Sequence, residues 1–112
     1  MLTVNTSTNA ISKGSAFEFD TKNGRYPASI KIGTNRILCA YQATNSKGWA
    51  QILNVAPATG KITKQATIVF DSSKCVYPAL AQVTADKYIC AYQAQYDFGA
   101  ANILNTDLKI LP

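Results

Sequence analysis

The chain has 112 residues, of which 47% are hydrophobic and only 15% are charged, whereas about a quarter of the residues of a globular domain are usually charged. The length and composition indicate one folded domain with a modest core. The formal net charge is +5, but the basic residues are scattered singly, so we expect no nucleic-acid partner. No apolar run of about 20 residues is present, so we expect no membrane span.

The first half of the chain is predicted to form short β-strands joined by turns. Thr, Val, Ile, Tyr and Phe crowd its segments, and Gly, Pro or Asn interrupts them at short intervals, which disfavours helices. The expected elements are, in chain order, an outer strand within residues 11–19, an inner strand at 27–32, a tight turn at 33–36, a second strand at 37–42, a third strand at 49–55, a turn at 56–61 and a fourth strand at 62–70.

The second half repeats the first at a fixed shift of 51 positions. The pentapeptide CAYQA occurs at 39–43 and again at 90–94, and 15 of the 36 positions in residues 19–54 are identical in residues 70–105. Strands corresponding to those of the first half are expected at 78–83, 88–93 and 100–106. A period of this length is typical of propellers, solenoids and other arrays. The predicted organisation is an N-terminal segment (1–19), a first unit (20–70) and a second, incomplete unit (71–112).

The second strand of each unit is apolar on both of its faces. Residues 37–41 read ILCAY and residues 88–92 read YICAY, whereas a meander with one hydrated face would alternate apolar and polar residues. Both faces of each sheet must therefore be covered, and four-stranded sheets stacked face to face around an axis achieve this. The predicted fold class is all-β, with two four-stranded antiparallel meanders that are blades of a β-propeller.

Each unit resembles the blades of sialidase-like and integrin-like propellers. The resemblance rests on an outer strand ending in Phe-Asp, a loop, and Tyr-Pro-Ala at the opening of the inner strand, followed by a hydrophobic second strand. The arrangement of two units in one chain also resembles that of small fucose-binding lectins, which build six-bladed rings from three two-blade chains. The resemblance implies a ring completed by oligomerisation, with six or eight blades.

Known propellers have about 4–8 blades, so a ring built from this chain requires further copies of it. The expected partner is the chain itself, as a homo-trimer or homo-tetramer in which residues 11–19 complete the second unit of a neighbour. An open version of the same head-to-tail contact would form a filament.

The loops that follow the second and the fourth strands are expected to share one rim of the propeller. Carbohydrate sites use aromatic faces together with fixed amide and carboxylate groups, so glycans are the expected ligands of a multivalent, non-enzymatic binding module. The candidate ligand-binding residues on this rim are Asp20, Tyr26, Gln42, Trp49, Asp71, Tyr77, Gln93, Tyr96, Asp97 and Phe98.

A purely structural role for the same residues is the alternative. The Asp residues can cap their own turns, the Gln residues can bond between neighbouring units, and Tyr-Pro can simply start the inner strand. Trp49, whose counterpart is Ala100, is either a ligand platform or a plug between units. The protein would then be a self-assembling fragment, filament or virion component without a small-molecule ligand.

Catalytic and metal chemistry are not expected. The chain has no His, a single Glu and three Cys without a C-x-x-C pair, so we predict no catalytic residue, no metal site and no cofactor. Sialidase chemistry needs an arginine cluster, and only Arg25 and Arg36 are present. Cys39 and Cys90 lie in apolar strands and are expected to be buried, whereas Cys75 faces a loop and is the one thiol that solvent could reach. The N-terminus has no signal-peptide pattern, and the compartment stays open.

Overall fold

The computed structural model describes residues 2–14, 16–108 and 110–111. Strands make up about 63% of the described residues, and every pair of described strands is antiparallel. The described residues contain no α-helix, and the two 3₁₀ turns are η1 (Thr44–Ser46) and η2 (Gln95–Asp97). The predicted all-β class and its antiparallel pairing are confirmed.

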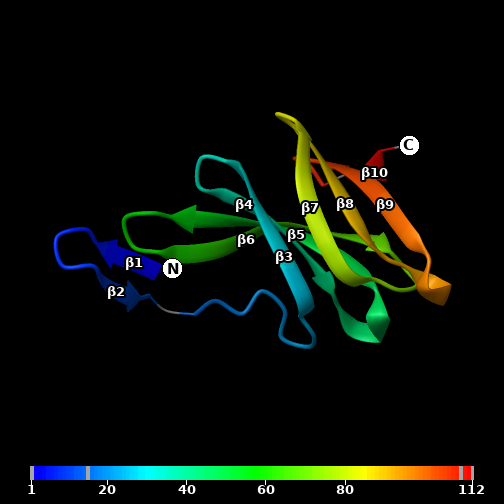
Figure 1. Ribbon diagram of the computed structural model, residues 1–112, viewed down its shortest axis with the longest axis horizontal. Coiled ribbons are helices and arrows are strands. Elements are labelled where there is room, and N and C mark those ends of the chain that lie inside the picture. Colours follow the sequence, from blue (N-terminus) through cyan, green and yellow to red (C-terminus); the bar gives the residue numbers. More distant parts are fainter. Residues whose placement is uncertain (1, 15, 109, 112) are drawn as a thin grey trace.

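Eight of the ten described strands form two four-stranded sheets (Figure 1). Sheet I has the order β3-β4-β5-β6, with β3 (Arg25–Gly33), β4 (Arg36–Gln42), β5 (Gly48–Ala56) and β6 (Lys61–Asp71). Sheet II has the order β10-β9-β8-β7, with β7 (Val76–Thr84), β8 (Lys87–Gln93), β9 (Gly99–Asn105) and the short β10 (Ile110–Leu111). The remaining hairpin consists of β1 (Leu2–Asn5) and β2 (Ala10–Lys13).

Corresponding strands of the two sheets are separated by one period of the sequence. Strands β7, β8 and β9 begin one period after β3, β4 and β5, and η2 follows η1 at the same spacing. The irregularities in the ladders also correspond, because the pairing of β3 with β4 shifts between Arg25 and Ala28 and that of β7 with β8 between Val76 and Ala79. The sequence period is thus a period of local structure, including its bulges.

The two sheets pack face to face around one main core. Side chains alternate between the faces of a strand, and in sheet I one face presents residues that are almost completely buried. Sheet II covers this face with the other set of alternating positions: Tyr88 and Cys90 of β8 are buried in the core, and they correspond in sequence to Ile37 and Cys39 on the far face of β4. The core residues of sheet I are Ile32 at 7% exposed, Leu38 at 1%, Ala40 and Ala50 at 0% and Ile52 at 1%.

The second face of sheet I holds a smaller core, whereas the second face of sheet II is exposed at Ala91 and Ala101 and half-buried at Ile89 and Ile103. Cys39, Tyr41 and Ala43 are buried on the second face of sheet I under Phe19, Trp49 and Leu53. Strand β4 is therefore buried on both faces, as its apolar sequence predicts. In β8 only the face toward sheet I is fully buried.

The N-terminal segment forms a hairpin in the single chain. Residues 11–19 are predicted to be an outer strand, but β2 pairs with β1 and residues 16–19 are not in a strand. The register of this hairpin repeats the tip of β5–β6, since Leu2 faces Lys13 as Leu53 faces Lys64. Among the described strands, β1 and β2 pair only with each other, and their hairpin lies at one end of the 49 Å axis of the molecule (Figure 1).

All three cysteines are free and buried. This confirms the expectation for Cys39 and Cys90, and solvent does not reach Cys75 either, because this residue is 0% exposed. The amide of Cys75 donates to the carbonyl of Ser46 over 2.8 Å, which draws the segment that enters sheet II against η1. Burial raises the pKa of Cys39 to about 11 and that of Cys75 and Cys90 to about 12, so none of these thiols is an activated nucleophile.

Candidate functional site

The loops expected to share a rim do lie at one end of the sheets. The turns that lead into β3 and β7 lie next to η1 and η2, toward the lower edge of Figure 1. The amide Nδ2 of Asn23 donates to the carbonyl of Ala43 over 3.3 Å, and the contact of Cys75 with Ser46 joins the corresponding segment of sheet II to the loop of sheet I. The rim therefore brings together segments that are well separated in the sequence.

Asp20 is held by three hydrogen bonds at the edge of sheet I. Its Oδ1 accepts from the amides of Lys22 at 2.8 Å and Asn23 at 3.1 Å, and its Oδ2 accepts from the hydroxyl of Tyr41 at 2.9 Å. Gln51 Nε2 donates both to the carbonyl of Phe19 at 2.8 Å and to the hydroxyl of Tyr41 at 2.7 Å. We call Phe19, Asp20, Tyr41 and Gln51 junction I.

The same arrangement recurs one period later and ties sheet I to sheet II. Asp71 accepts from the amides of Ser73 and Lys74 and, at 2.7 Å, from the hydroxyl of Tyr92. Asn102 Nδ2 donates to the carbonyl of Phe70 at 3.4 Å and to the hydroxyl of Tyr92 at 3.0 Å. The edge-on ring contacts recur too, at 4.9 Å for Phe19 with Tyr41 and 5.2 Å for Phe70 with Tyr92. We call Phe70, Asp71, Tyr92 and Asn102 junction II.

The junctions shift the titration of their members. Burial alone would raise the pKa of both carboxyls, but the backbone amides and the tyrosine hydroxyls hold the pKa of Asp20 and of Asp71 below its ordinary value. Burial, followed by the bond to the carboxylate, raises the pKa of the Tyr41 and Tyr92 hydroxyls. The aspartates are thus ionised acceptors that cap their own turns, the structural role considered from the sequence.

The two glutamines differ in their surroundings. Gln42 is 6% exposed, and its Nε2 donates to the carbonyl of Cys75 over 2.9 Å, so it bonds sheet I to the segment that enters sheet II. Gln93, which is half-buried, donates over 3.0 Å to Oδ1 of Asp97, which also lies 3.2 Å from Lys74 Nζ. Of the two, only Gln93 lies near the surface of the rim.

Tyr26 and Tyr77 contact each other where β3 and β7 begin. Their ring centroids are 4.5 Å apart, and the residues are 40% and 66% exposed. Both have a left-handed backbone with φ of 52°, although a residue before proline usually prefers an extended one. The bulge at the start of each inner strand imposes this conformation, which the sequence did not predict.

Tyr96 and Phe98 form a second exposed aromatic pair beside η2. Tyr96 is 78% exposed and Phe98 is 68% exposed, with ring centroids 6.3 Å apart. Their counterparts in sheet I are Asn45 and Lys47, so this pair occurs once per chain.

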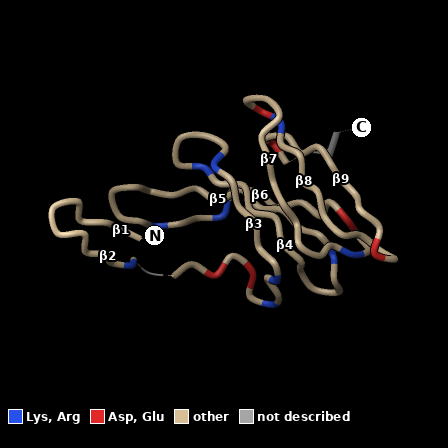
Figure 2. The backbone as a smooth tube through the Cα atoms, in the orientation of Figure 1, with Lys and Arg blue, Asp and Glu red and all other residues tan. Residues whose placement is uncertain are grey.

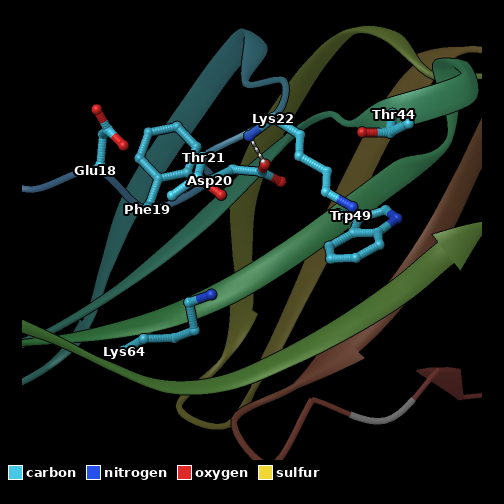
Figure 3. A pocket seen from close by; sticks show the side chains of 8 residues that line it. All are labelled: Glu18, Phe19, Asp20, Thr21, Lys22, Thr44, Trp49 and Lys64. Atoms are coloured by element: carbon cyan, nitrogen blue, oxygen red, sulfur yellow. Dashed lines mark hydrogen bonds between the residues drawn. The ribbon is translucent and has the colours of Figure 1, made fainter.

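Trp49 and Asp20 line a rim pocket of about 300 Å³ (Figure 3). The Lys22 side chain extends toward the indole of Trp49, and Thr44 lies above the indole in this view. The indole Nε1 of Trp49 is buried and has no hydrogen-bond partner. Sequence reasoning missed the other residues of this rim pocket, because their positions depend on the approach of the N-terminal segment to β5; they are Glu18, Phe19, Thr21, Lys22, Thr44 and Lys64.

A second, apolar pocket of about 340 Å³ lies on the outward face of sheet I. Ile37, Cys39 and Leu53 line its floor, and Phe19 and Pro27 belong to its walls. This hollow faces away from sheet II, because Ile37 and Cys39 point to the face of β4 opposite to the one that enters the main core.

The predicted site residues therefore do not form one site. Asp20, Gln42 and Asp71 are engaged in hydrogen bonds within the fold, two aromatic pairs are exposed, and Asp20 and Trp49 share the rim pocket. Among the described residues, no group of three or more His, Cys, Asp or Glu side chains is placed to hold a metal ion, and no helix is long and apolar enough to cross a membrane. Lys and Arg are scattered along the backbone (Figure 2).

Comparison of the chain with protein-family models, with curated proteins and with solved structures gave no match.

Proposed function

We propose that this protein is a non-enzymatic β-propeller subunit whose function is assembly, through the stacking of its sheets on those of further copies. Sheets I and II are then two successive blades, and the copies close into a ring of six or eight blades. An interface between unlike faces of the same chain is heterologous, and such interfaces close into rings when the rotation per subunit permits.

The observation that carries the proposal is the bare outer face of sheet II. Ala91 and Ala101 are exposed there, although Ala40 and Ala50, their identical counterparts in sheet I, are 0% exposed beneath sheet II. Val83 is 54% exposed, whereas its counterpart Ile32 is 7% exposed. The outer face of sheet II consists of Ala79, Ala81, Val83, Ile89, Ala91, Ala101 and Ile103.

The opposite end of the molecule offers the complementary surface. Sheet II packs on sheet I through one of its faces, and the outward face of sheet I is the equivalent of that face one period earlier. The identical residues on the two faces are Cys39, Tyr41 and Ala43 in sheet I and Cys90, Tyr92 and Ala94 in sheet II. The apolar hollow floored by Ile37, Cys39 and Leu53 lies on this face. Since both complementary faces belong to one chain, a second copy is the partner that fits. Burying apolar area contributes about 25 cal/mol per Å² to such an association.

A charge placed on the outer face of sheet II tests the proposal. Ala91→Asp adds a carboxylate at an exposed position, so the isolated chain should keep its fold, while stacking would bury an unpaired charge. By light scattering, we expect the wild type to have a mass of three or four times 12.1 kDa. At the same concentration, Ala91→Asp should have the mass of one chain.

The matched control is Thr34→Asp, which adds the same charge to the exposed turn between β3 and β4. It should assemble like the wild type. Assembly of Ala91→Asp with wild-type mass and affinity would exclude the outer face of sheet II as the interface.

A carbohydrate-binding function at the rim pocket is the second candidate. It is favoured by one observation, the buried indole N–H of Trp49 without a partner beside a hollow that also presents Asp20, Lys22 and Thr44. An aromatic face with a few fixed polar groups is the usual composition of a sugar site. Because Ala100 replaces Trp49 in sheet II, the expected stoichiometry is one sugar per chain rather than two.

Titration with monosaccharides, chosen from a glycan-array screen and followed by calorimetry, tests this second candidate. We expect binding at one site per chain and at least a tenfold loss of affinity in Trp49→Leu, because aromatic stacking is lost. Thr59→Leu, in the exposed turn between β5 and β6, is the control. Equal binding by wild type and Trp49→Leu, or no binding by the wild type, would remove the pocket from consideration.

A further inference from the structure

Gly48 and Gly99 occupy the same position in the two sheets but have different surroundings. A Cβ on Gly48 would lie 2.7 Å from Cε2 of Phe70 and 2.8 Å from Cβ of Cys75, which is closer than side chains can approach. A Cβ on Gly99 would have no atom within 4 Å. Gly48 is buried and Gly99 is exposed.

Nothing in the described part of the single chain accounts for glycine at position 99. It begins β9, and its φ is not in the left-handed region that favours glycine, which Gly60 alone adopts among the described glycines. Glycine in a strand is otherwise unfavourable and often marks a close approach of another group. The open space at Gly99 is therefore the feature to explain.

The group that crowds Gly48 has a counterpart elsewhere in the chain. Phe70 precedes Asp71, the residue that pairs with Gly48 across β5 and β6. The residue one period before Phe70 is Phe19. Phe19 packs on Tyr41 of sheet I, so it does not reach Gly99 of its own chain.

We propose that residues 17–20 of a second copy pair with the free edge of β9, and that Phe19 of the partner subunit covers Gly99. This inference rests on the proposed ring and specifies its contact. Transferring the β5–β6 register places Gly99 opposite Asp20 of the partner subunit and Ala101 opposite Phe17 of the partner subunit, as Gly48 faces Asp71 and Ala50 faces Ile68.

The edge of β9 is open where this register requires it. In sheet I, β6 pairs with β5 from Gly48 onward. In sheet II, β10 pairs only with Ile103 and Leu104, and no described strand pairs with residues 99–102 on that side. An open edge of this kind is a template for another chain.

The contacts that Phe19 makes within its own chain permit this second contact. Phe70 lies against Gly48 of its own sheet and at the same time packs on Tyr92 of the next sheet. Phe19 already has the second of these contacts, with Tyr41. Covering a partner's Gly99 would give it the first, so that junction I becomes a full equivalent of junction II.

Gly99→Val tests the inference, with Gly33→Val as the matched control. Both Cβ positions are free of neighbours within 4 Å in the single chain, so the dilute variants should show wild-type circular dichroism and melting temperature. Overpacking at a contact is destabilising, so we expect Gly99→Val to raise the dissociation constant of self-association roughly tenfold or more. Gly33→Val should leave it unchanged.

The outcomes separate this inference from the proposed function. A wild type that stays monomeric at every concentration would contradict the ring itself and the strand contact with it. A wild type that assembles, together with a Gly99→Val variant that assembles as tightly, would overturn the contact at Gly99 and leave the ring standing.

Cysteine cross-linking provides a second measurement that needs no change at Gly99. Phe17→Cys and Ala101→Cys are made in separate chains, mixed at assembling concentration and oxidised. Residues directly opposite in an antiparallel pair have Cβ atoms about 4.5–5.5 Å apart, so we expect a disulfide-linked heterodimer. The control mixture of Phe17→Cys with Gly33→Cys should give none. Equal yields from the two mixtures would refute the register.

Discussion

At the scale of single residues, Tyr41 and Tyr92 hold the two junctions together. Each hydroxyl donates to an aspartate and accepts from the side-chain amide of Gln51 or Asn102. Both tyrosines are buried, at 0% and 7% exposed, so their partners have no ready replacement in water. Turn capping by Asp20 and Asp71 was considered from the sequence, but the tyrosine that completes each junction was not, because it lies on a strand well beyond the turn that the aspartate caps.

Removal of either hydroxyl should destabilise the protein. Tyr41→Phe or Tyr92→Phe leaves a buried amide and a carboxylate without their shared partner, which costs about 1–3 kcal/mol in the free energy of unfolding. Urea unfolding followed by circular dichroism measures this, and Tyr26→Phe, whose residue is 40% exposed, is the control. A loss no larger than that of Tyr26→Phe would mean that the junction bonds do not stabilise the fold.

The junctions also set the pH dependence of stability. The pKa of Asp20 and of Asp71 is below 3.8 in the fold, so their contribution is present above pH 3.8 and is lost as the pH falls through the folded values. The pKa of Tyr41 and of Tyr92 is raised above 10.0, so their contribution is present below pH 10 and is lost as the pH rises further.

Unfolding free energies measured across this range should therefore decline on both sides. The buried thiols, whose pKa is raised from 9.0 to about 11 or 12, begin the alkaline decline at about pH 9. In Tyr41→Phe/Tyr92→Phe the decline above pH 10 should be shallower than in the wild type. An identical alkaline limb in the two proteins would contradict this assignment.

At the scale of elements, the strands and turns follow from local sequence, and their partners do not. The strands end at the predicted turn residues: β3 ends at Gly33, and β5 ends just before Pro57, in the turn that contains Gly60. The N-terminal hairpin follows from the repeat, because Leu2 and Lys13 correspond to Leu53 and Lys64 at the tip of β5–β6, whereas residues 16–19, expected in an outer strand, are not in a strand of the single chain. The rim pocket depends likewise on where this segment returns to β5.

The hairpin β1–β2 should be labile in the monomer and protected in the assembly. All eight residues of its two strands are exposed, and an isolated two-stranded hairpin is at best marginally stable in water. Hydrogen exchange at low and at high protein concentration measures this, and we expect protection of residues 2–13 only at the high concentration. The amides of β4, buried on both faces, are the internal control. Protection of the hairpin that does not change with concentration would contradict the proposed contact.

At the scale of the whole molecule, the two sheets of one chain already provide one example of the proposed interface between copies. The residues of this interface recur, one period apart, on the outward face of sheet I and on the outer face of sheet II, and both of these faces are apolar and incompletely covered. The apolar sequence of both second strands predicts covered faces, and one chain covers both faces only for β4. In the proposed assembly a further copy covers the remaining face of β8, and the sequence repeat indicates such a copy without specifying the contacts that it makes.

The central claim is tested most directly by the solution mass of the unmodified chain, measured by sedimentation equilibrium over a wide range of concentrations. Closed rings predict one discrete species, of three or four chains of 12.1 kDa each, in equilibrium with the monomer. A folded monomer that persists at the highest concentration would contradict the account.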